Sequence, residues 1–537
     1  MQNKYRNWSL AKDGIGPFFI IFLLLLNGCA LLPKAIEETE ALPEIMTITV
    51  EPIAVAPLRE VRAVWMSRFD YSESAKSKTP DSIRMYIESS FQKFKAANIN
   101  TIIFQVRGNG DAFYQSAYEP WSHMLSDSLG KDPGWDPLAF AVESAHKRGL
   151  ELHAWINTFP AWRGLEDPIP TTPLQPYLAH PEWIVCDSSG TPMPKSDHYI
   201  SFSPGIPAAR RHIVNVVQDI VSKYDVDGIH FDYIRYPENS PNMGYSHDSV
   251  SVARFNSPES NPLQLDWADW QREQVTAFIS EAYNGIVAIK PWIKVSTAVI
   301  GSYNLPGWNG YHIVYQDARR WAELGKVDFL TPMSYYGRHQ EGHEFPRMIR
   351  YWADLPNMEG RPILPGLGAY RLPFDEILEE IEDVREAGFP GHVLFAASSL
   401  NDENLQKIKA QKFPYPALLP VLAWKDQIAP LAPADLLAEI RDNQVQLSWT
   451  ASPAPADGDI VREYVIYHVS ELPIDPQNPQ NILAIIPGGC YQYTVSGLDT
   501  ALPHYFSVTA IDDAENQSQL SPVASVLESQ SPTSESH

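Results

Sequence analysis

Cysteines are few for a chain of this length. Only three occur in 537 residues, so a small fold stapled by several disulfides is excluded. Cys186 and Cys490 are far apart in the sequence, and we expect each to be a buried thiol. Basic residues are also scarce, because 41 lysines and arginines face 65 aspartates and glutamates, giving a formal charge of −24. Such a surface repels phosphate backbones, so the sequence disfavours a nucleic-acid-binding protein.

Several motifs that would indicate a metal or a cofactor are absent. The sequence has no HExxH, no paired CxxC and no carboxylate–glycine calcium loop, so we expect no metal centre. It has no G-x-S-x-G nucleophile elbow either. No glycine-rich fingerprint follows the first expected strand, which disfavours a doubly wound nucleotide-binding sheet, and we therefore expect no cofactor.

The N-terminus lacks an apolar run long enough to span a bilayer. Residues 18–26 are nine consecutive apolar residues that follow a basic segment, which is typical of a secretory signal peptide. Residues 26–29 read Leu-Asn-Gly-Cys and resemble the bacterial lipobox. The resemblance implies removal of residues 1–28 and lipidation of Cys29, with ordinary signal cleavage as the alternative. Residues 29–57 predict a disordered tether, and we expect attachment to the outer membrane.

Residues 58–414 alternate short apolar segments with amphipathic segments. The apolar segments predict strands, and the intervening segments have helical spacing, with capping pairs such as Thr79 before Pro80. Eight such units predict an α/β fold, a (β/α)8 TIM barrel with insertions, with an open doubly wound sheet as the rival. The expected strands are residues 62–67, 101–106, 150–156, 228–233, 294–299, 327–333, 363–367 and 393–397.

The C-terminal part of the chain has a different character. Residues 415–429 are proline-rich and predict a linker or a wrapped connector. Residues 430–528 contain four segments in which apolar and polar residues alternate between turns. This pattern resembles a fibronectin type III sandwich, a small immunoglobulin-like all-β fold, with Trp449 as its core tryptophan. Residues 529–537 are rich in serine and predict a disordered tail.

The densest group of candidate catalytic residues is DGIHFDYIRYP (227–237). In a TIM barrel the reacting groups lie at the C-terminal ends of the strands, and alternate residues point inward. The inward residues of this segment would include His230 and, at the strand end, Asp232, with Tyr233 and Arg235 following. Asp232 can act as nucleophile, base or stabiliser of a developing cation. The alternative is a structural carboxylate paired with Arg235.

Other strand ends supply candidates for holding a substrate. Gln105 and Arg107 are expected on one face of the second strand, where Arg107 would bind substrate or keep the strand-end aspartate ionised. On the third strand, Asn157 is the polar residue nearest the C-terminal end. His153 lies nearer the N-terminal end and is either a ligand or a core histidine. Tyr335, after the sixth strand, can donate a hydrogen bond toward the same end of the barrel.

These segments together resemble a known family. REVRAVWMSRFDY (59–71), FQVRGNGDAFYQS (104–116), GLELHAWINTF (149–159), DGIHFDYIRYP (227–237) and DFLTPMSYY (328–336) follow one another in order. In this they resemble glycosyl-hydrolase-like family 10. The resemblance implies a TIM-barrel O-glycosidase of the bacterial envelope, often a lipoprotein, and some members are associated with peptidoglycan glycan strands. Many relatives carry a second Asp where this chain has Tyr233, so the proton donor must be sought elsewhere.

A more distant similarity concerns chitinase-type barrels, whose strands read DGxDxDxE and MxYD. In that register Asp232 aligns with the last Asp of DGxDxDxE, and His230 aligns with the preceding Asp of that motif. The proton-donor position falls on Ile234, and the Asp of the sixth strand falls on Tyr336. We therefore expect the acid to be Glu238, in the loop that follows. The reserve candidates are Glu273 and Asp70.

The sequence thus predicts a membrane-anchored glycoside hydrolase that cleaves O-glycosidic bonds in an envelope or extracellular polysaccharide. Asp232 would support an oxocarbenium-like centre, and Glu238 would donate the proton. The rival is a catalytically inactive, surface-anchored glycan-binding lipoprotein, and a third possibility is an envelope scaffold with an exposed apolar patch. The residues expected to position the glycan are Gln105, Arg107, His153, Asn157, His230, Tyr233, Arg235 and Tyr335.

Overall fold

The structure, a computed structural model, describes residues 56–526 except residues 76, 357, 359 and 454. The predicted signal peptide, the lipidation site Cys29, nearly all of the predicted tether and the predicted tail lie outside the described residues. Within the described residues, no helix combines the length and the apolar character needed to traverse a lipid bilayer.

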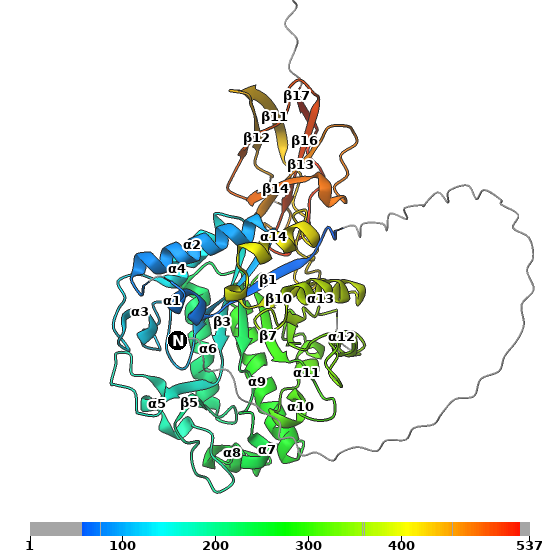
Figure 1. Cartoon of the computed structure of the whole chain (residues 1–537). Helices are drawn as coiled ribbons and strands as arrows, with labels where there is room; N and C mark the ends of the chain where they lie inside the picture. Colours follow the sequence, from blue (N-terminus) through cyan, green and yellow to red (C-terminus); the bar gives the residue numbers. More distant parts are fainter. Residues whose placement is uncertain (1–55, 76, 357, 359, 454, 527–537) are drawn as a thin grey trace, which may run out of the picture. The chain divides into compact units, whose positions relative to one another are not determined.

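A closed barrel of eight parallel strands occupies the larger part of the described chain, and helices surround it (Figure 1). The barrel strands pair in chain order, and β1 closes the ring by pairing with β10, with Val61 opposite Gly391. This arrangement confirms the predicted (β/α)8 fold. The barrel strands are β1 (Val61–Met66), β2 (Thr101–Arg107), β3 (Glu151–Asn157), β6 (Gly228–Asp232), β7 (Lys294–Ile300), β8 (Phe329–Met333), β9 (Gly366–Leu367) and β10 (Gly391–Phe395).

Helices form where a capping residue precedes apolar residues at helical spacing. In α2 (Pro80–Ala96) the Thr79 side chain accepts a hydrogen bond from the backbone N–H of Ser82, and Ile83 and Ile87 are buried. The other helices are α1 (Arg68–Glu73), α3 (His123–Ser126), α4 (Pro137–His146), α5 (Pro176–Ala179), α6 (Pro207–Lys223), α7 (Ser240–Met243), α8 (Ser249–Phe255), α9 (Trp267–Val287), α10 (Gly310–Ile313), α11 (Ala318–Glu323), α12 (Phe345–Ala353), α13 (Phe374–Glu386) and α14 (Asp402–Gln411).

An insertion between β3 and α6 contains a further sheet that the sequence did not predict. Its strands, β4 (Pro160–Gly164) and β5 (Ser196–Ser201), pair antiparallel. The insertion starts directly after the C-terminal end of β3. It therefore adds residues at the barrel end where the strands terminate.

Glycines make room for large rings inside the barrel. Trp65 of β1 lies in the interior among apolar residues of the other strands. A Cβ added to Gly366 of β9 would lie 2.8 Å from the Trp65 ring. Nearer the N-terminal end of the barrel, a Cβ at Gly228 would overlap the His153 ring. Glycine at these two positions is thus required by close packing across the barrel.

A β-bulge near the end of β2 changes the direction of one predicted site residue. β2 and β3 pair regularly up to Gln105 opposite Trp155, but Arg107 then pairs with Ile156. The extra residue turns Arg107 away from the barrel interior. Gln105 and Arg107 therefore do not share a face, contrary to the expectation from strict alternation.

Arg107 is fully buried and bound to protein groups. Its Nε and Nη2 donate to the two carboxylate oxygens of Glu119 at 2.8 and 2.7 Å. Its Nη1 donates to three backbone carbonyls between residues 157 and 160. The prediction that Arg107 binds substrate or keeps the strand-end aspartate ionised is therefore wrong. Its guanidinium instead fixes the chain that leaves β3.

The C-terminal residues form a β-sandwich of two antiparallel sheets, with orders β11-β12-β15 and β14-β13-β16-β17. Trp449 and Tyr464 come from the two sheets and meet in the core with ring centroids 5.5 Å apart, which confirms the predicted place of Trp449. The strands are β11 (Ala434–Arg441), β12 (Gln444–Thr450), β13 (Glu463–Val469), β14 (Ile482–Pro487), β15 (Gln492–Val495), β16 (His504–Ile511) and β17 (Ala524–Val526).

The two cysteines in the described residues are both free thiols, as expected. Cys186 is half-buried, whereas Cys490 is exposed. The expected burial of Cys490 is wrong because the residue lies in the turn between β14 and β15, outside the sandwich core.

The proline-rich residues 415–429 pack against the barrel as a connector. Leu418 forms backbone hydrogen bonds with the segment that precedes β1. Further along, Trp424 Nε1 and Lys425 Nζ contact the buried carboxylate of Asp328 at 2.8 and 3.0 Å. Asp328 immediately precedes β8, at the N-terminal end of that strand. The connector is therefore attached to the barrel at the end where the strands begin.

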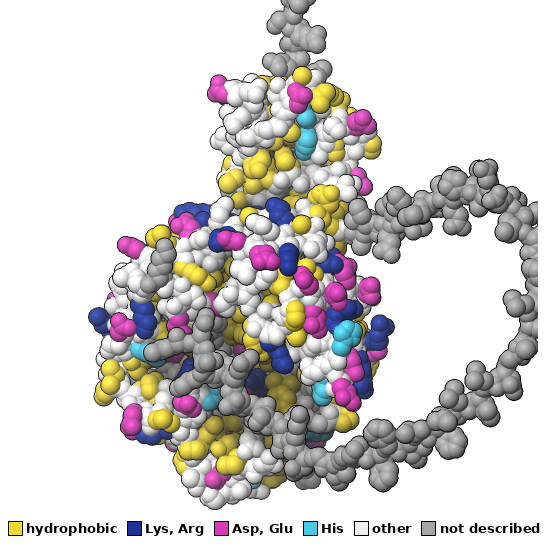
Figure 2. Space-filling model, in the orientation of Figure 1, with side chains coloured by type: hydrophobic (Ala, Val, Ile, Leu, Met, Phe, Trp, Pro, Cys, Tyr) yellow, Lys and Arg dark blue, Asp and Glu magenta, His cyan; other side chains and the backbone are white. Residues whose placement is uncertain are grey.

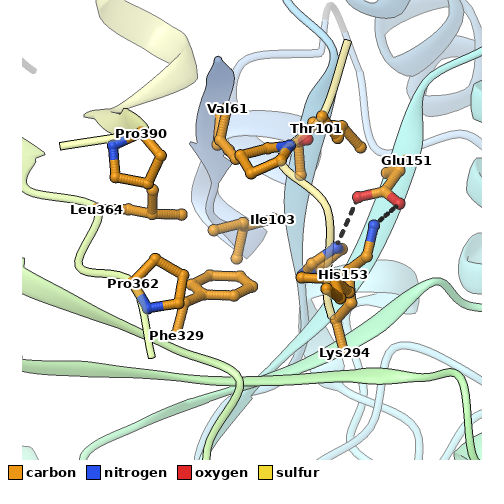
Figure 3. A pocket seen from close by; sticks show the side chains of 14 residues that line it. Val61, Thr101, Ile103, Glu151, His153, Lys294, Phe329, Pro362, Leu364 and Pro390 are labelled. Carbon is orange, nitrogen blue, oxygen red and sulfur yellow. Dashed lines mark hydrogen bonds and ion pairs between the residues drawn. The ribbon is translucent and has the colours of Figure 1, made fainter. Parts of the chain in front are cut away.

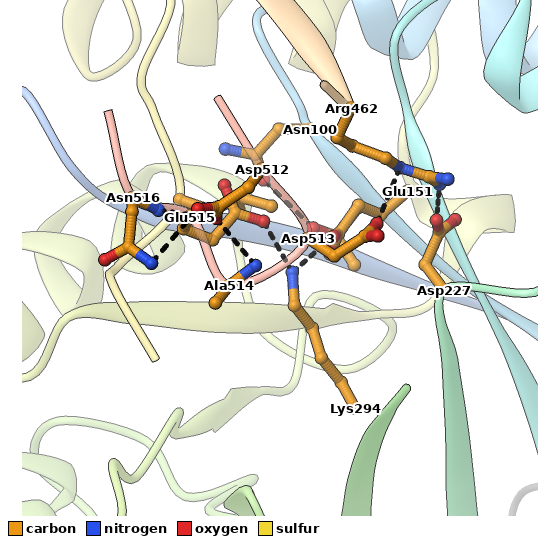
Figure 4. A network of polar contacts seen from close by, with 12 residues as sticks. Asn100, Glu151, Asp227, Lys294, Arg462, Asp512, Asp513, Ala514, Glu515 and Asn516 are labelled. Carbon is orange, nitrogen blue, oxygen red and sulfur yellow. Dashed lines mark hydrogen bonds and ion pairs between the residues drawn. The ribbon is translucent and has the colours of Figure 1, made fainter. Parts of the chain in front are cut away.

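A buried ionic network joins the sandwich to the same end of the barrel (Figure 4). Lys294, at the start of β7, binds Glu151 of β3 and, at 2.7 Å, Glu515 in the turn after β16. Arg462 of the sandwich binds Asp227, next to β6. Burial opposes the charge on both glutamates, but Lys294 holds the pKa of Glu151 below its usual value, while the pKa of Glu515 is raised. The sandwich is thus fixed away from the C-terminal ends of the strands.

The role of Arg107 predicts a stability effect. Replacement of Arg107 by methionine should lower the free energy of unfolding by about 3–5 kcal/mol, because the buried Glu119 would lose its bidentate partner and keep only the His212 contact at 3.0 Å. Urea denaturation of Arg107→Met measures the loss. The control is Arg347→Met, whose side chain is 69% exposed and 3.8 Å from Glu344, and which should cost less than about 1 kcal/mol. Equal losses in the two variants would contradict a structural role for Arg107.

Candidate active site

His230 is held as a neutral residue in the middle of the barrel. The indole Nε1 of Trp65 donates to His230 Nε2 at 3.0 Å, so the proton of His230 lies on Nδ1, 2.8 Å from Ser296 Oγ. Burial lowers the pKa of His230 well below its usual value, and the neighbouring His153 adds to this shift. Both ring nitrogens have partners inside the barrel. The predicted substrate contact by His230 is therefore wrong, and the residue serves packing.

His153 lies nearer the N-terminal end of the barrel and is also a core histidine. Its Nε2 is 3.3 Å from Glu151 Oε2, and its ring is 5.8 Å from that of Phe329. It lines a small cavity of about 30 Å³, next to Lys294 (Figure 3). That volume accommodates about one water molecule and no sugar ring. The prediction of His153 as a substrate ligand is wrong because the residue lies too deep in the barrel.

Gln105 and Asn157 form a pair at the C-terminal end of the barrel. Gln105 Nε2 donates to Asn157 Oδ1 at 2.9 Å, and the backbone N–H of Arg68 donates to Gln105 Oε1 at 3.0 Å. Gln105 is thereby fixed and in turn orients the Asn157 amide. Among the described residues, the Nδ2 of Asn157 has no hydrogen-bond acceptor. Asn157 thus presents a free donor to a ligand, whereas Gln105 only orients the Asn157 side chain.

Asp232 lies beside Asn157, at the end of β6, as predicted. The two residues are register partners across β3 and β6. Asp232 Oδ1 accepts a hydrogen bond from the backbone N–H of Tyr233 at 2.6 Å. Tyr233 has a φ of +49°, a left-handed conformation that is uncommon for a tyrosine. The strand therefore ends abruptly, and the chain turns toward the loop that carries the next charged residues.

Arg235 connects Asp232 with Glu238. Its Nη1 lies 3.9 Å from Asp232 Oδ1, and its Nη2 lies 3.2 Å from Glu238 Oε1. The guanidinium carbon is 4.4 Å from the centre of the Tyr233 ring. Glu238 also accepts a hydrogen bond of 2.6 Å from the hydroxyl of Tyr199. The structure thus brings together the two carboxylates that the sequence proposed as a catalytic pair.

The environments of the two carboxylates shift their pKa values in opposite directions. Burial raises the pKa of Asp232, and the Arg235 charge and the Tyr233 N–H offset this only in part. Burial also disfavours the charge on Glu238, but Arg235 and the Tyr199 hydroxyl outweigh it and hold the pKa of Glu238 below its usual value. Divergent pKa values in one pair are the basis for assigning a protonated acid and an ionised partner.

Aromatic rings occupy the neighbouring strand ends. Tyr335, after β8, stacks on Phe395 of β10 with ring centroids 5.4 Å apart, and Tyr370 packs edge-on against both rings. Burial and then the charge of Asp232 raise the pKa of Tyr335 well above its usual value. Tyr370 is 52% exposed and can present a ring face to a sugar.

The sequence did not predict Tyr199 and Tyr370 as site residues. Tyr199 lies on β5, inside the insertion that was not expected to form a strand. The alternation of polar and apolar residues in HYISF (198–202) is the signal that could have revealed this strand. Tyr370 follows β9, which is only two residues long and gives little pattern to locate its end.

The two reserve acids are not available for catalysis. Asp70 caps α1, and its carboxylate accepts hydrogen bonds from the backbone N–H groups of Ser67 at 2.6 Å and Ser398 at 3.1 Å. Glu273 lies on the surrounding helix α9, where Arg320 of α11 is its nearest charge partner. Neither residue joins the group around Asp232.

One group of carboxylates in the described part of the chain is close enough together to hold a metal ion. It consists of Asp426, Asp457 and Asp459, in the connector and the sandwich. None of these residues belongs to the barrel end that carries Asp232 and Glu238.

Two curated proteins are similar to this chain in sequence. Glycosyl hydrolase YngK of Bacillus subtilis (strain 168) is 28% identical over 404 residues, which cover 70% of this chain and 76% of that protein. Glycosyl hydrolase DigH of Escherichia coli (strain K12) is 28% identical over 340 residues, 59% of this chain and 74% of that protein.

Among solved structures, the PgaB (BpsB) glycoside hydrolase domain from Bordetella bronchiseptica matches with a TM-score of 0.47 and 12% identity, over 66% of this chain and 99% of that one. The family model described as glycosyl hydrolase-like 10 matches residues 60–380, more than half of the sequence. The chain therefore belongs to the glycosyl hydrolase-like 10 family.

Proposed function

We propose that the protein is a glycoside hydrolase that cleaves O-glycosidic bonds at the C-terminal end of its barrel. The observation that carries the proposal is the sharing of Arg235 by Asp232 and Glu238. Both carboxylates lie within 4 Å of one guanidinium, so they are no more than about 10 Å apart, the range that glycosidases use for their paired carboxylates. The names of the curated relatives, both glycosyl hydrolases, support the same reaction class.

The two pKa shifts suggest how the roles are divided. Asp232, whose pKa is raised, is the proton donor to the glycosidic oxygen. Glu238, whose pKa is lowered, stays ionised and supports the cation-like transition state, as a base toward water or as a nucleophile. This division is the reverse of the one proposed from the sequence, where burial of the strand-end aspartate could not be seen.

The surrounding residues give the site its means of holding a sugar. Asn157 offers a donor beside Asp232, and the charge of Asp232 helps to raise the pKa of the Tyr233 and Tyr335 hydroxyls. Tyr370 offers an exposed ring for stacking on a sugar face. A polysaccharide substrate is the class of ligand that this combination of aromatic faces and neutral donors suits.

We propose a polysaccharide of the cell envelope or the cell exterior as the substrate, with peptidoglycan glycan strands as the first candidate. The support is the lipobox-like sequence that ends at Cys29, since a lipid anchor would hold the enzyme at the envelope.

The alternative function is a catalytically inactive, lipid-anchored glycan-binding protein. It is favoured by Tyr233, because the family resemblance of the sequence implies a second Asp at that position. It is disfavoured by Glu238, which supplies a second carboxylate from the loop. Turnover by the wild-type protein separates the two functions.

Asp232→Asn and Glu238→Gln test the proposed pair. Each should lower turnover of stem-peptide-free peptidoglycan about 10²–10⁴-fold, because each removes a proton donor or an ionised carboxylate from the reaction. Release of reducing ends measures the loss. Glu182→Gln, at a carboxylate whose side chain is 63% exposed, is the control and should retain full activity. Full activity in either site variant would remove that residue from the mechanism.

Arg235→Met tests the division of roles through the pH profile. Activity needs Glu238 ionised and Asp232 protonated, so the active range lies between the two pKa values. The Arg235 charge lowers the pKa of both carboxylates. Its removal should therefore move both limbs of kcat/KM to higher pH, and Arg235→Lys should restore the original position. A profile that stays in place, or moves to lower pH, would contradict the assignment.

Cys29→Ser tests the lipid anchor. The variant should appear in the soluble fraction, whereas the unchanged protein should sediment with membranes and yield a diacylglycerol-modified N-terminal peptide in mass spectrometry. Cys186→Ser is the matched control and should remain with the membranes. Membrane retention of Cys29→Ser would contradict anchoring through this cysteine.

A further inference from the structure

Arg68 differs from every other buried arginine in the described residues. Six arginines are at least nine-tenths buried, and Arg68 is 6% exposed. Five of the six have a carboxylate within 4 Å, whereas none lies within that distance of Arg68. The five paired arginines are Arg62, Arg107, Arg210, Arg235 and Arg272. Among the described residues, the Arg68 guanidinium also has no hydrogen-bond acceptor, so its N–H groups are available to a ligand.

The position of Arg68 places this cation at the candidate active site. Arg68 follows the C-terminal end of β1, and its backbone N–H binds Gln105, the residue that orients Asn157. It is near enough to Tyr233 for the two side chains to affect each other's charge. Gly108 leaves space beside it, since an added Cβ would lie 3.1 Å from the guanidinium carbon.

A second arginine lies close to Arg68. Arg68 lies over the Phe69 ring at 4.5 Å, and Arg163 lies 5.7 Å from the centre of the same ring. Asp111 is the opposing charge that acts most strongly on the pKa of Arg68, but its Oδ1 accepts a hydrogen bond from the backbone N–H of Asn109 at 2.7 Å. Acidic and basic side chains are interspersed on the face that Figure 2 shows.

Resting on the proposed hydrolase function, we propose that Arg68 is a specificity residue that binds a carboxylate carried by a sugar of the substrate. The planar guanidinium can bind a carboxylate with two parallel hydrogen bonds, which a neutral hydroxyl cannot match. The bound carboxylate would also neutralise the buried charge. The substrate would therefore be an anionic glycan, whose carboxylate belongs either to a uronic acid or to a lactyl ether on an amino sugar.

Two pairs of oligosaccharides test this inference on the full-length protein. One pair is oligogalacturonate and its carboxyl-reduced form, and the other is an N-acetylmuramic-acid-containing glycan and its carboxyl-reduced form. Binding is measured in the Asp232→Asn background, so that turnover does not consume the probe. The intact form of at least one pair should bind about 10- to 100-fold more tightly than its reduced form. The preferred pair identifies the source of the carboxylate.

Three variants in that background assign the preference to Arg68. Arg68→Met should abolish the difference between intact and reduced glycan, and Arg68→Lys should keep part of it. Arg320→Met, at an exposed arginine on α11, removes the same charge elsewhere and should leave the difference unchanged. Because the Arg68 guanidinium has no hydrogen-bond acceptor and no carboxylate within 4 Å among the described residues, Arg68→Met should keep or raise the melting temperature, which a structural arginine would not allow.

The inference fails if reduction of the carboxyl group leaves binding unchanged, if neither intact probe binds, or if Arg68→Met retains the preference. Hydrolysis of neutral glycans without such a preference would leave the proposed function standing and overturn the role of Arg68. Conversely, a binding preference that depends on Arg68, found in a protein that hydrolyses no glycan, would support the role of Arg68 and overturn the proposed hydrolase function.

Discussion

Closure of eight parallel strands is the constraint on which the candidate site depends. Because the strands run in one direction, all of their C-terminal ends meet at one end of the barrel. Asn157, Asp232 and Tyr335 are separated by many residues in the sequence and become neighbours only through this closure. The interior rings are accommodated by glycines, notably Gly228 and Gly366, so the packing that fills the barrel also fixes the height of each strand end.

The two ends of the barrel have different roles. At the N-terminal end, buried ion pairs between Lys294, Glu151 and Glu515 attach the sandwich. At the C-terminal end, Arg235 is shared by two carboxylates whose pKa values diverge. Stability and chemistry are thereby separated in space. The sandwich contributes to the first and has no residue in the second among the contacts described.

The sequence was sufficient for the barrel and for part of the site. Strand-length apolar segments located all eight barrel strands, and the alternation within 228–232 correctly placed Asp232 at a strand end. Alternation failed at Arg107, because a bulge adds a residue that hydrophobic patterns do not reveal. It also could not distinguish depth, so His230 was expected to be a ligand, and the choice between a ligand and a core histidine stayed open for His153. Tyr199 was not predicted as a site residue because its strand belongs to an insertion that has no counterpart in the repeating strand–helix pattern.

The central claim is that the protein hydrolyses a glycosidic bond. Incorporation of oxygen from water into the products tests this claim most directly. The full-length protein is incubated in ¹⁸O-labelled water with peptidoglycan strands stripped of stem peptides and, separately, with chitin oligomers, and the products are weighed by mass spectrometry. The account predicts shortened glycans that carry one ¹⁸O at each new reducing end. Shortened products without the label, or no shortening of either glycan, would contradict it.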